Sequence, residues 1–161
     1  MSLSLDLYSE ELDYEVHLTE SALHTISLHR KLLQEHKPES CGIIIGEIRE
    51  KSLTVIDIST PAHDDIRTRV SFHRKSSHHQ LYLNKIHEIS DGQLQYIGEW
   101  HTHPEPTPTP SFADYQGWNK LIHNPEFNLF PKLIWIAGNN NATADWFCLI
   151  NNKKYYILQN S

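Results

Sequence analysis

Apolar residues in the first part of the chain recur at helical spacing. The recurrence runs from Ala22 to Leu33 and follows Thr19, a residue type that caps helix N-termini. It predicts a helix that starts at Thr19, reaches about His36 and is ended by Pro38, because proline lacks an amide donor and fixes φ.

Short apolar and β-branched runs elsewhere predict the strands of a sheet. The run at residues 41–46 has no polar alternation, which is typical of a strand buried on both faces. Polar turns separate the runs, and asparagine clusters at residues 139–141 and 151–152 predict hairpins. The predicted strands are one edge strand at residues 14–18 and strands at residues 41–46, 52–59, 94–100, 133–138, 144–150 and 154–159.

Two more helices and a stiff loop complete the pattern. Residues 76–90 carry spaced leucines and isoleucines that predict a helix, whereas residues 61–74 have the weak pattern of an exposed loop with a short strand. Ser111 stands at an N-cap position ahead of a helix that reaches about His123. Alternating prolines at positions 104, 106, 108 and 110 predict a stiff connection before it.

Helices and strands alternate along the chain without a repeat or a linker. A length of 161 residues with 39% hydrophobic residues suits one domain with a single core. We therefore expect one α/β domain over residues 1–161, built on a mixed sheet.

Composition narrows the functional classes. The net charge of −6 argues against binding to duplex nucleic acid, because no excess of Lys and Arg is available to neutralise phosphates. No apolar run reaches the roughly 18–20 residues of a membrane span, and the N-terminus lacks the pattern of a secretory signal. The two cysteines, Cys41 and Cys148, lie in apolar runs where buried reduced thiols are expected. These features predict a cytoplasmic protein.

The candidate chemistry begins with His101 and His103, at the end of the predicted strand 94–100. Side chains alternate along a strand, so two histidines one residue apart project from the same face. Asp114, on the first turn of the next helix, can complete a site of two imidazoles and one carboxylate. Three such ligands with a fourth position left for water are typical of catalytic rather than structural zinc. Most of the other histidines are interpreted as ordinary surface or helix residues, and His63, His73 and His123 have no partner at ligand spacing.

A metal-assisted hydrolase also needs a general base outside the metal ligands. Four carboxylates are candidates, and spacing alone does not choose among them: Glu39, Glu47, Glu99 and Glu105. Ser111 is interpreted as a helix N-cap. The four tryptophans, at positions 100, 118, 135 and 146, are interpreted as core residues.

Three segments together resemble the JAMM motif of JAB/MPN domain metalloproteases. They are Pro38-Glu-Ser-Cys-Gly-Ile-Ile-Ile-Gly46, His101-Thr-His-Pro104 and Ser111-Phe-Ala-Asp114. The resemblance covers roughly residues 17–150 and implies an MPN (JAB) fold, a mixed curved sheet flanked by helices. It also implies zinc ligation by His101, His103 and Asp114, proton transfer by Glu39, and a hydrogen bond from Ser111 to the oxyanion or to water.

The sequence around His101, Gly-Glu-Trp-His-Thr-His-Pro followed by a proline-rich loop, further resembles stand-alone bacterial JAB peptidases. Those peptidases belong to CBASS antiphage operons and related ubiquitin-like conjugation operons. That resemblance implies hydrolysis of the isopeptide or peptide bond after the C-terminal tail of a ubiquitin-like protein. Conjugating and activating enzymes of the same operon are then possible partners. An extended tail adds to an exposed sheet edge through main-chain hydrogen bonds, and residues 66–72 are our candidate edge.

Other classes fit less well. A metal-free MPN scaffold typically lacks one of the motif residues, all of which are present. An amidohydrolase barrel with His-x-His needs about 200 residues or more. A JAB peptidase acting on cell-wall or phage-tail substrates stays open as an alternative, although the absence of a secretory signal argues against it.

Overall fold

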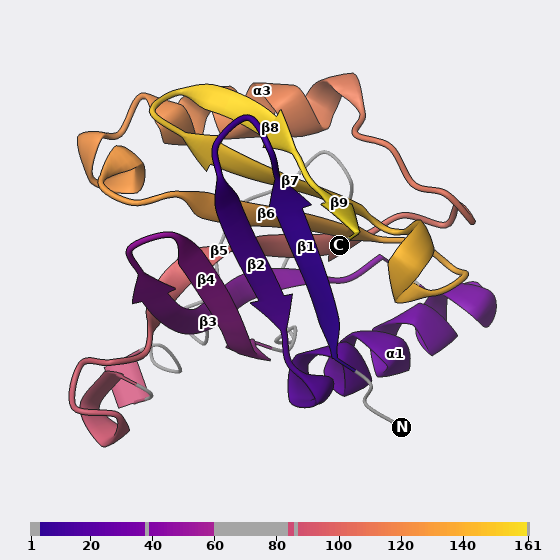
Figure 1. Ribbon diagram of the computed structural model, residues 1–161. Coiled ribbons are helices and arrows are strands. Elements are labelled where there is room, and N and C mark those ends of the chain that lie inside the picture. The colour runs from indigo at the N-terminus through magenta and orange to yellow at the C-terminus, as the bar shows by residue number, and fades with distance from the viewer. Residues whose placement is uncertain (1–3, 38, 60–83, 86, 161) are drawn as a thin grey trace.

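A computed structural model describes residues 4–37, 39–59, 84–85 and 87–160. One large, strongly curved sheet of nine strands dominates these residues, in the order β8-β7-β6-β5-β3-β4-β2-β1-β9 (Figure 1). Its strands are β1 (Leu5–Ser9), β2 (Tyr14–Leu18), β3 (Cys41–Arg49), β4 (Ser52–Ile58), β5 (Gln95–Thr102), β6 (Lys132–Ala137), β7 (Trp146–Asn151), β8 (Lys154–Ile157) and β9 (Gln159–Asn160). The helices are α1 (Glu20–Gln34) and α3 (Phe112–Ile122), with the short 3-10 turns η1 (Pro125–Asn128) and η2 (Ala142–Ala144). The expected α/β class with a mixed, curved sheet is confirmed.

Helix α1 begins as expected and ends by a different device. The Thr19 hydroxyl accepts the Ala22 amide at the N-terminus. At the other end His36 takes a left-handed conformation with φ of 60°, and the amide of Lys37 donates to the carbonyl of Leu32. This is a Schellman motif, which satisfies the last carbonyls of the helix. The helix therefore stops at Gln34 without needing Pro38, which lies outside the described residues.

Alternation along the central strands divides the core between two faces of the sheet. Trp135 of β6 packs in a cluster with Ala22 and Ile26 of α1, whereas Ile134 and Ile136 pack with residues of α3. Since neighbouring side chains on a strand point to opposite faces, the two helices are associated with opposite faces of β6. Trp100, Trp118 and Trp135 are fully buried, as expected, while Trp146 is only partly buried.

Strand β5 lies between β3, its antiparallel partner, and β6, its parallel partner. Gly98 is required at this point, because a Cβ there would overlap the main-chain oxygen of Leu133 on β6. A register shift at the same glycine interrupts the pairing with β3. Because β5 and β6 are parallel, their carboxyl ends lie at the same end of the strands, where the candidate histidines are found.

Several local expectations are corrected. Residues 14–18 form β2, which is not an edge strand, because β1 pairs on one side and β4 on the other. The N-terminal strand β1 and the final strand β9, which pairs with it, were not expected. The predicted strand at 144–150 begins only at Trp146, after the turn η2.

Part of the predicted helix 76–90 lies within the described residues. Asn84, Lys85 and residues 87–89 are helical, and Ser90 lies in a turn. Residues 76–83 and 86 lie outside the described residues. So does the candidate edge at residues 66–72.

A buried ion pair connects α1 to the segment that follows the carboxyl end of β6. Arg30 donates to both carboxylate oxygens of Asp145, at 2.8 and 2.9 Å, and to the carbonyl of Gly138 at 2.6 Å. The same carboxylate accepts the indole N–H of Trp135 and the amide of Gly138. Charge-assisted bonds of this kind are strong when they are dry, and this network anchors the loop that follows β6.

Both cysteines are buried and free of disulfides, as expected. Among the helices that the structure describes, none combines the length and the apolar character that a membrane crossing requires.

Candidate metal centre

Two neighbouring segments supply the three candidate ligands. His101 lies near the end of β5, and His103 follows the strand, where its amide donates to the carbonyl of Ala137. Asp114 lies in the first turn of α3, which starts with a capping box: the Ser111 hydroxyl accepts the Asp114 amide and the Asp114 carboxylate accepts the Ser111 amide. The capping box therefore orients the carboxylate as well as starting the helix.

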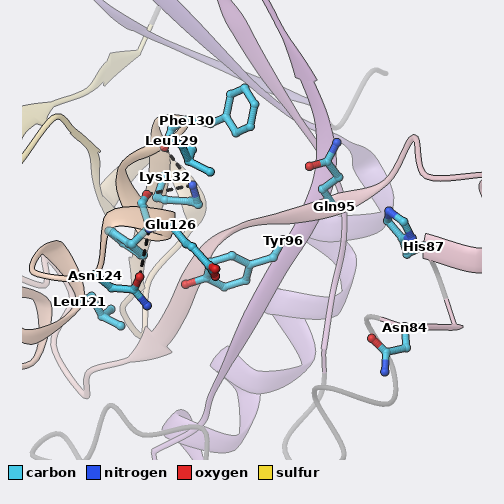
Figure 2. Close-up of a pocket in the computed structure, with 11 residues that line it drawn as sticks. Asn84, His87, Gln95, Tyr96, Leu121, Asn124, Glu126, Leu129, Phe130 and Lys132 are labelled. Carbon is cyan, nitrogen blue, oxygen red and sulfur yellow. Dashed lines mark hydrogen bonds between the residues drawn. The ribbon is translucent and has the colours of Figure 1, made fainter.

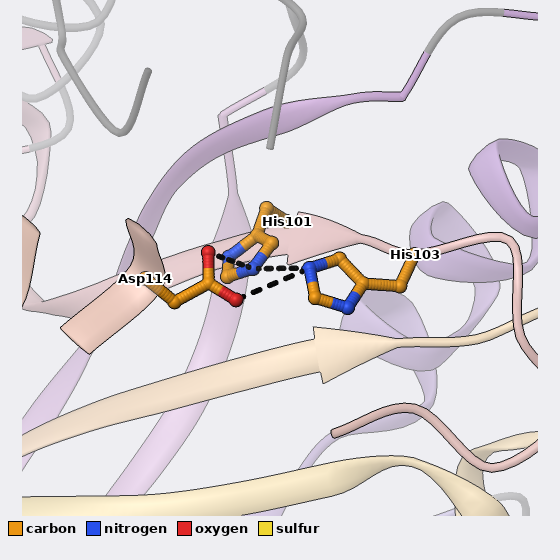
Figure 3. A group of neighbouring side chains, drawn as sticks. All are labelled: His101, His103 and Asp114. Atoms are coloured by element: carbon orange, nitrogen blue, oxygen red, sulfur yellow. Dashed lines mark hydrogen bonds and ion pairs between the residues drawn. The ribbon is translucent and has the colours of Figure 1, made fainter. Parts of the chain in front are cut away.

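The three side chains converge, as Figure 3 shows. Nε2 of His101 lies 3.2 Å from Nε2 of His103. Oδ1 of Asp114 lies 3.3 Å from Nε2 of His101, and Oδ2 lies 3.2 Å from Nε2 of His103. All three are buried, with exposed fractions of 4% for His101, 0% for His103 and 1% for Asp114. In the described part of the chain, these are the residues whose ligand atoms gather closely enough to hold a metal ion.

Burial and neighbouring groups set the protonation states. Burial lowers the pKa of His101, which favours the neutral imidazole. Burial by itself would raise the pKa of Asp114, but hydrogen bonds to His101 and His103 outweigh it and hold that pKa well below its ordinary value. A neutral imidazole and an ionised carboxylate are the forms that bind a divalent cation.

The spacing of these groups fits a metal better than it fits hydrogen bonds alone. A neutral imidazole carries one ring proton, so the two facing Nε2 atoms cannot both donate to the carboxylate and also satisfy each other at 3.2 Å. Ligand atoms placed about 2.0–2.1 Å from a tetrahedral zinc ion lie about 3.3–3.4 Å apart. The separation of 3.2 Å between the two Nε2 atoms is close to the edge of such a tetrahedron, and each imidazole also has one Asp114 oxygen within 3.3 Å.

Glu39 is the candidate general base that the fold brings to this site. It precedes Cys41, which pairs with His101 across β3 and β5. Its side chain is half-buried, and its charge acts on His101, where it opposes the lowering of the pKa.

The other three carboxylates have different surroundings. Glu47 lies toward the opposite end of β3 and pairs with Arg49 near the surface, at 3.1 Å. Glu99 is buried and accepts the hydroxyl of Tyr96 at 2.6 Å. Glu105 lies 3.3 Å from Nδ1 of His103, on the side of that ring away from Asp114. Glu39 and Glu105 thus both act on the candidate ligands.

The loop that carries the alternating prolines, residues 104–110, is held against the carboxyl end of β6. The amide of Glu105 donates to the carbonyl of His103, and the amide of Asn139 donates to the carbonyl of Glu105. Gly138 leaves no room for a side chain, because a Cβ would overlap the carbonyl oxygen of Glu105. The loop behind His103 is therefore fixed by the Gly138 segment that Arg30 and Asp145 anchor.

Sequence reasoning missed Thr102, Arg30 and Asp145. The available signal for Thr102 was its place between the two histidines, as a β-branched residue at an interior position. Arg30 and Asp145 are separated by 115 residues, and only a charged residue on an otherwise apolar helix face hinted at a buried pair.

A hollow of about 620 Å³ lies away from this site, near the opposite ends of β5 and β6 (Figure 2). Leu121, Phe127, Leu129 and Phe130 supply its apolar lining. Lys132 also lines it and donates to the carbonyls of Phe127 and Phe130, while burial lowers the pKa of its amine to about 8. This hollow and the candidate metal ligands are thus separate features.

The chain matches a known protein family over most of its length. Residues 21–149 match the family described as prokaryotic homologs of the JAB domain, and the chain belongs to that family. A solved solution structure, that of protein DSY2949 from Desulfitobacterium hafniense, shares the fold with a TM-score of 0.54 at 16% identity, covering 89% of this chain and 88% of that one.

Particular relatives are more similar in sequence. A protein of Escherichia coli (strain TW11681) named CD-NTase/cGAS isopeptidase is 37% identical, covering 88% of this chain and 87% of its own. A protein of Vibrio cholerae serotype O1 with the same name is 41% identical, covering 71% and 70%. A protein of Sinorhizobium fredii named a probable metalloprotease is 30% identical over 64% of this chain and 65% of its own.

Proposed function

We propose that this protein is a zinc-dependent isopeptidase or peptidase that cleaves the bond after the C-terminal tail of a ubiquitin-like protein. The observation that carries the proposal is the buried convergence of His101, His103 and Asp114 within a JAB-family fold. Relatives named CD-NTase/cGAS isopeptidase support an isopeptide substrate. We infer from them that the conjugate joins the modifier to a CD-NTase in CBASS antiphage defence. A reducing cytoplasm suits the two buried cysteines, which form no disulfide.

In the proposed reaction, zinc held by His101, His103 and Asp114 supplies a Lewis acid and lowers the pKa of water toward 7. The Glu39 carboxylate accepts a proton from the attacking water as its oxygen bonds to the scissile carbonyl carbon. Glu39 then delivers that proton to the departing amine nitrogen as the carbon–nitrogen bond breaks. The Ser111 hydroxyl donates a hydrogen bond to the oxyanion that develops on the carbonyl oxygen.

The protein surroundings suit these roles. The Ser111 hydroxyl accepts the Asp114 amide, which leaves its own proton available for donation. Glu105, close to Nδ1 of His103, is placed to orient that ring, as carboxylates behind metal-binding histidines commonly do. Enzymes of the same operon are the proposed partners, because they attach the modifier that this activity would remove.

The central test is cleavage of a fusion of a candidate ubiquitin-like protein, with zinc content measured in parallel. We expect Glu39→Gln to keep zinc and lower kcat by about 10²- to 10⁴-fold, because an amide cannot accept the proton. His103→Ala should lose both zinc and cleavage. Glu47→Gln is the matched control, because it removes a carboxylate of β3 that lies away from the ligands, and it should retain both.

Two outcomes would contradict the proposal. Full turnover by Glu39→Gln would remove Glu39 as the base. Wild-type protein that binds zinc but cleaves no conjugate of the operon's modifier would favour a scaffold or a cell-wall or phage-tail peptidase instead.

A further inference from the structure

Thr102 lies between the two candidate histidine ligands and faces away from them. Side chains alternate along β5, so the Thr102 hydroxyl projects from the face opposite His101. It is completely buried, with an exposed fraction of 0%. A threonine in this position has a structural interpretation as a strand-forming residue, but its hydroxyl makes a specific contact.

That contact is with the main chain of Ser40. The amide of Ser40 donates to Oγ1 of Thr102 at 2.8 Å, and the amide of Thr102 donates to the carbonyl of Ser40 at 2.9 Å. The regular pairing of β3 and β5 ends one residue earlier, at Cys41 and His101. The Thr102 side chain therefore supplies a hydrogen bond just beyond the point where the strand ladder stops.

The bonded amide belongs to the peptide unit that joins Glu39 to Ser40. A peptide unit is planar, so a hydrogen bond to the Ser40 nitrogen also fixes the direction in which the Glu39 main chain leaves. Ser40 is buried, with an exposed fraction of 1%, and its hydroxyl lies 3.2 Å from Nδ1 of His29 on α1. The segment that carries Glu39 is thus clamped from β5 on one side and from α1 on the other.

We propose that Thr102 is a positioning residue, whose hydroxyl holds the Glu39–Ser40 peptide and thereby places the Glu39 carboxylate relative to His101 and His103. The inference rests on the proposed role of Glu39 as general base. The end of β5 and the residue that follows it then supply two candidate ligands, while Thr102 between them aligns the base. Small errors in the placement of a catalytic group are costly, since proton transfer needs hydrogen-bond geometry.

The first experiment uses Thr102→Val, which keeps the shape and removes the hydroxyl, and Thr102→Ser, which keeps the hydroxyl. We expect Thr102→Val to lower kcat about 10- to 100-fold, as is typical for residues that orient groups at metal sites, with KM and zinc content little changed. Thr102→Ser should restore most of the rate. Thr102→Ala is a second variant without the hydroxyl, in case valine impairs folding.

The second readout does not depend on turnover. Hydrogen exchange of the Ser40 amide, measured with and without zinc, should be fast in Thr102→Val and slow in both wild type and Thr102→Ser. Ser59→Ala is the matched control, because Oγ of Ser59 likewise accepts a main-chain amide, that of Ile43 on β3, at 2.9 Å. Its loss should leave kcat and the exchange of the Ser40 amide unchanged.

A double-mutant cycle identifies the residue through which Thr102 acts. If it acts through Glu39, adding Thr102→Val to Glu39→Gln should slow the residual rate by less than twofold, because the group it positions is already disabled. Multiplicative losses, or a Thr102→Val enzyme with unchanged kcat, would overturn the inference. An inactive wild type, or a fully active Glu39→Gln variant, would instead overturn the proposed function.

Discussion

At the scale of single residues, several side chains of the centre serve the fold and the site together. Ser111 starts α3 and also stands beside the candidate ligands, and Asp114 closes the capping box while facing both imidazoles. The sequence could predict the N-cap, because the residue type and its place before a helix suffice. It could not predict that the Asp114 carboxylate would be almost fully buried.

Substitutions of Ser111 can separate its two roles. Ser111→Ala removes the cap and should lower the free energy of unfolding by about 0.5–2 kcal/mol, whereas Ser111→Gly should cost only a few tenths. Both remove the hydroxyl, so we expect both to lower kcat by about 10²- to 10³-fold if it stabilises the oxyanion. Urea unfolding and cleavage assays measure the two effects. A Ser111→Gly enzyme with normal kcat would leave Ser111 as a helix cap alone.

At the scale of elements, the clearest patterns predicted the structure well, and the pairing between elements did not follow from them. Helix α1 and strands β6 and β8 begin within a residue or two of the expected positions. Strand β1 was missed and β2 was wrongly expected at an edge, because its neighbours β1 and β4 are identified only by the assembled sheet. Local alternation reports which residues face a core, but not which strand lies alongside.

The buried pair of Arg30 and Asp145 makes a prediction at this scale. Asp145→Ala leaves the Arg30 charge buried without its partner and should lower the free energy of unfolding by about 3–5 kcal/mol. Arg49→Ala is the matched control, because it breaks a surface pair with Glu47 whose side chains are 70% and 32% exposed. That change should cost less than about 1 kcal/mol. Equal losses in denaturant unfolding would show that the buried network does not anchor the fold.

At the scale of the whole molecule, the curved sheet gathers segments that are distant in sequence. The start of β3 pairs with the end of β5, and Asp114 in the first turn of α3 lies against both histidines. The amide of His103 donates to the carbonyl of Ala137 at the end of β6. Three titratable side chains, those of His101, His103 and Asp114, are buried together there. Such a site stores free energy that a bound cation can release.

Metal removal should therefore destabilise the whole protein. A ligand that binds only the folded state stabilises it by about 1.4 kcal/mol for each tenfold rise in free concentration above Kd. We expect chelation to lower the Tm and zinc to restore it, with a shift of about 2–4 °C for each kcal/mol in a protein of this size. Asp114→Ala should show no such dependence in thermal scans. A Tm independent of zinc in the wild type would argue against metal binding at this site.

The sequence by itself determined the α/β class, the helix that starts at Thr19 and the identity of the His-x-His and Ser-x-x-Asp segments. These features are local, because periodicity, capping preference and residue type are written within a few neighbouring positions. Only the tertiary structure shows that the charge of Glu39 acts on the pKa of His101 whereas Glu47 pairs with Arg49. It alone also shows that the Thr102 hydroxyl accepts the Ser40 amide and that Arg30 pairs with Asp145. Those relations arise from strand register and from contacts across many residues of chain, where the folded packing selects one partner among several that the local pattern allows.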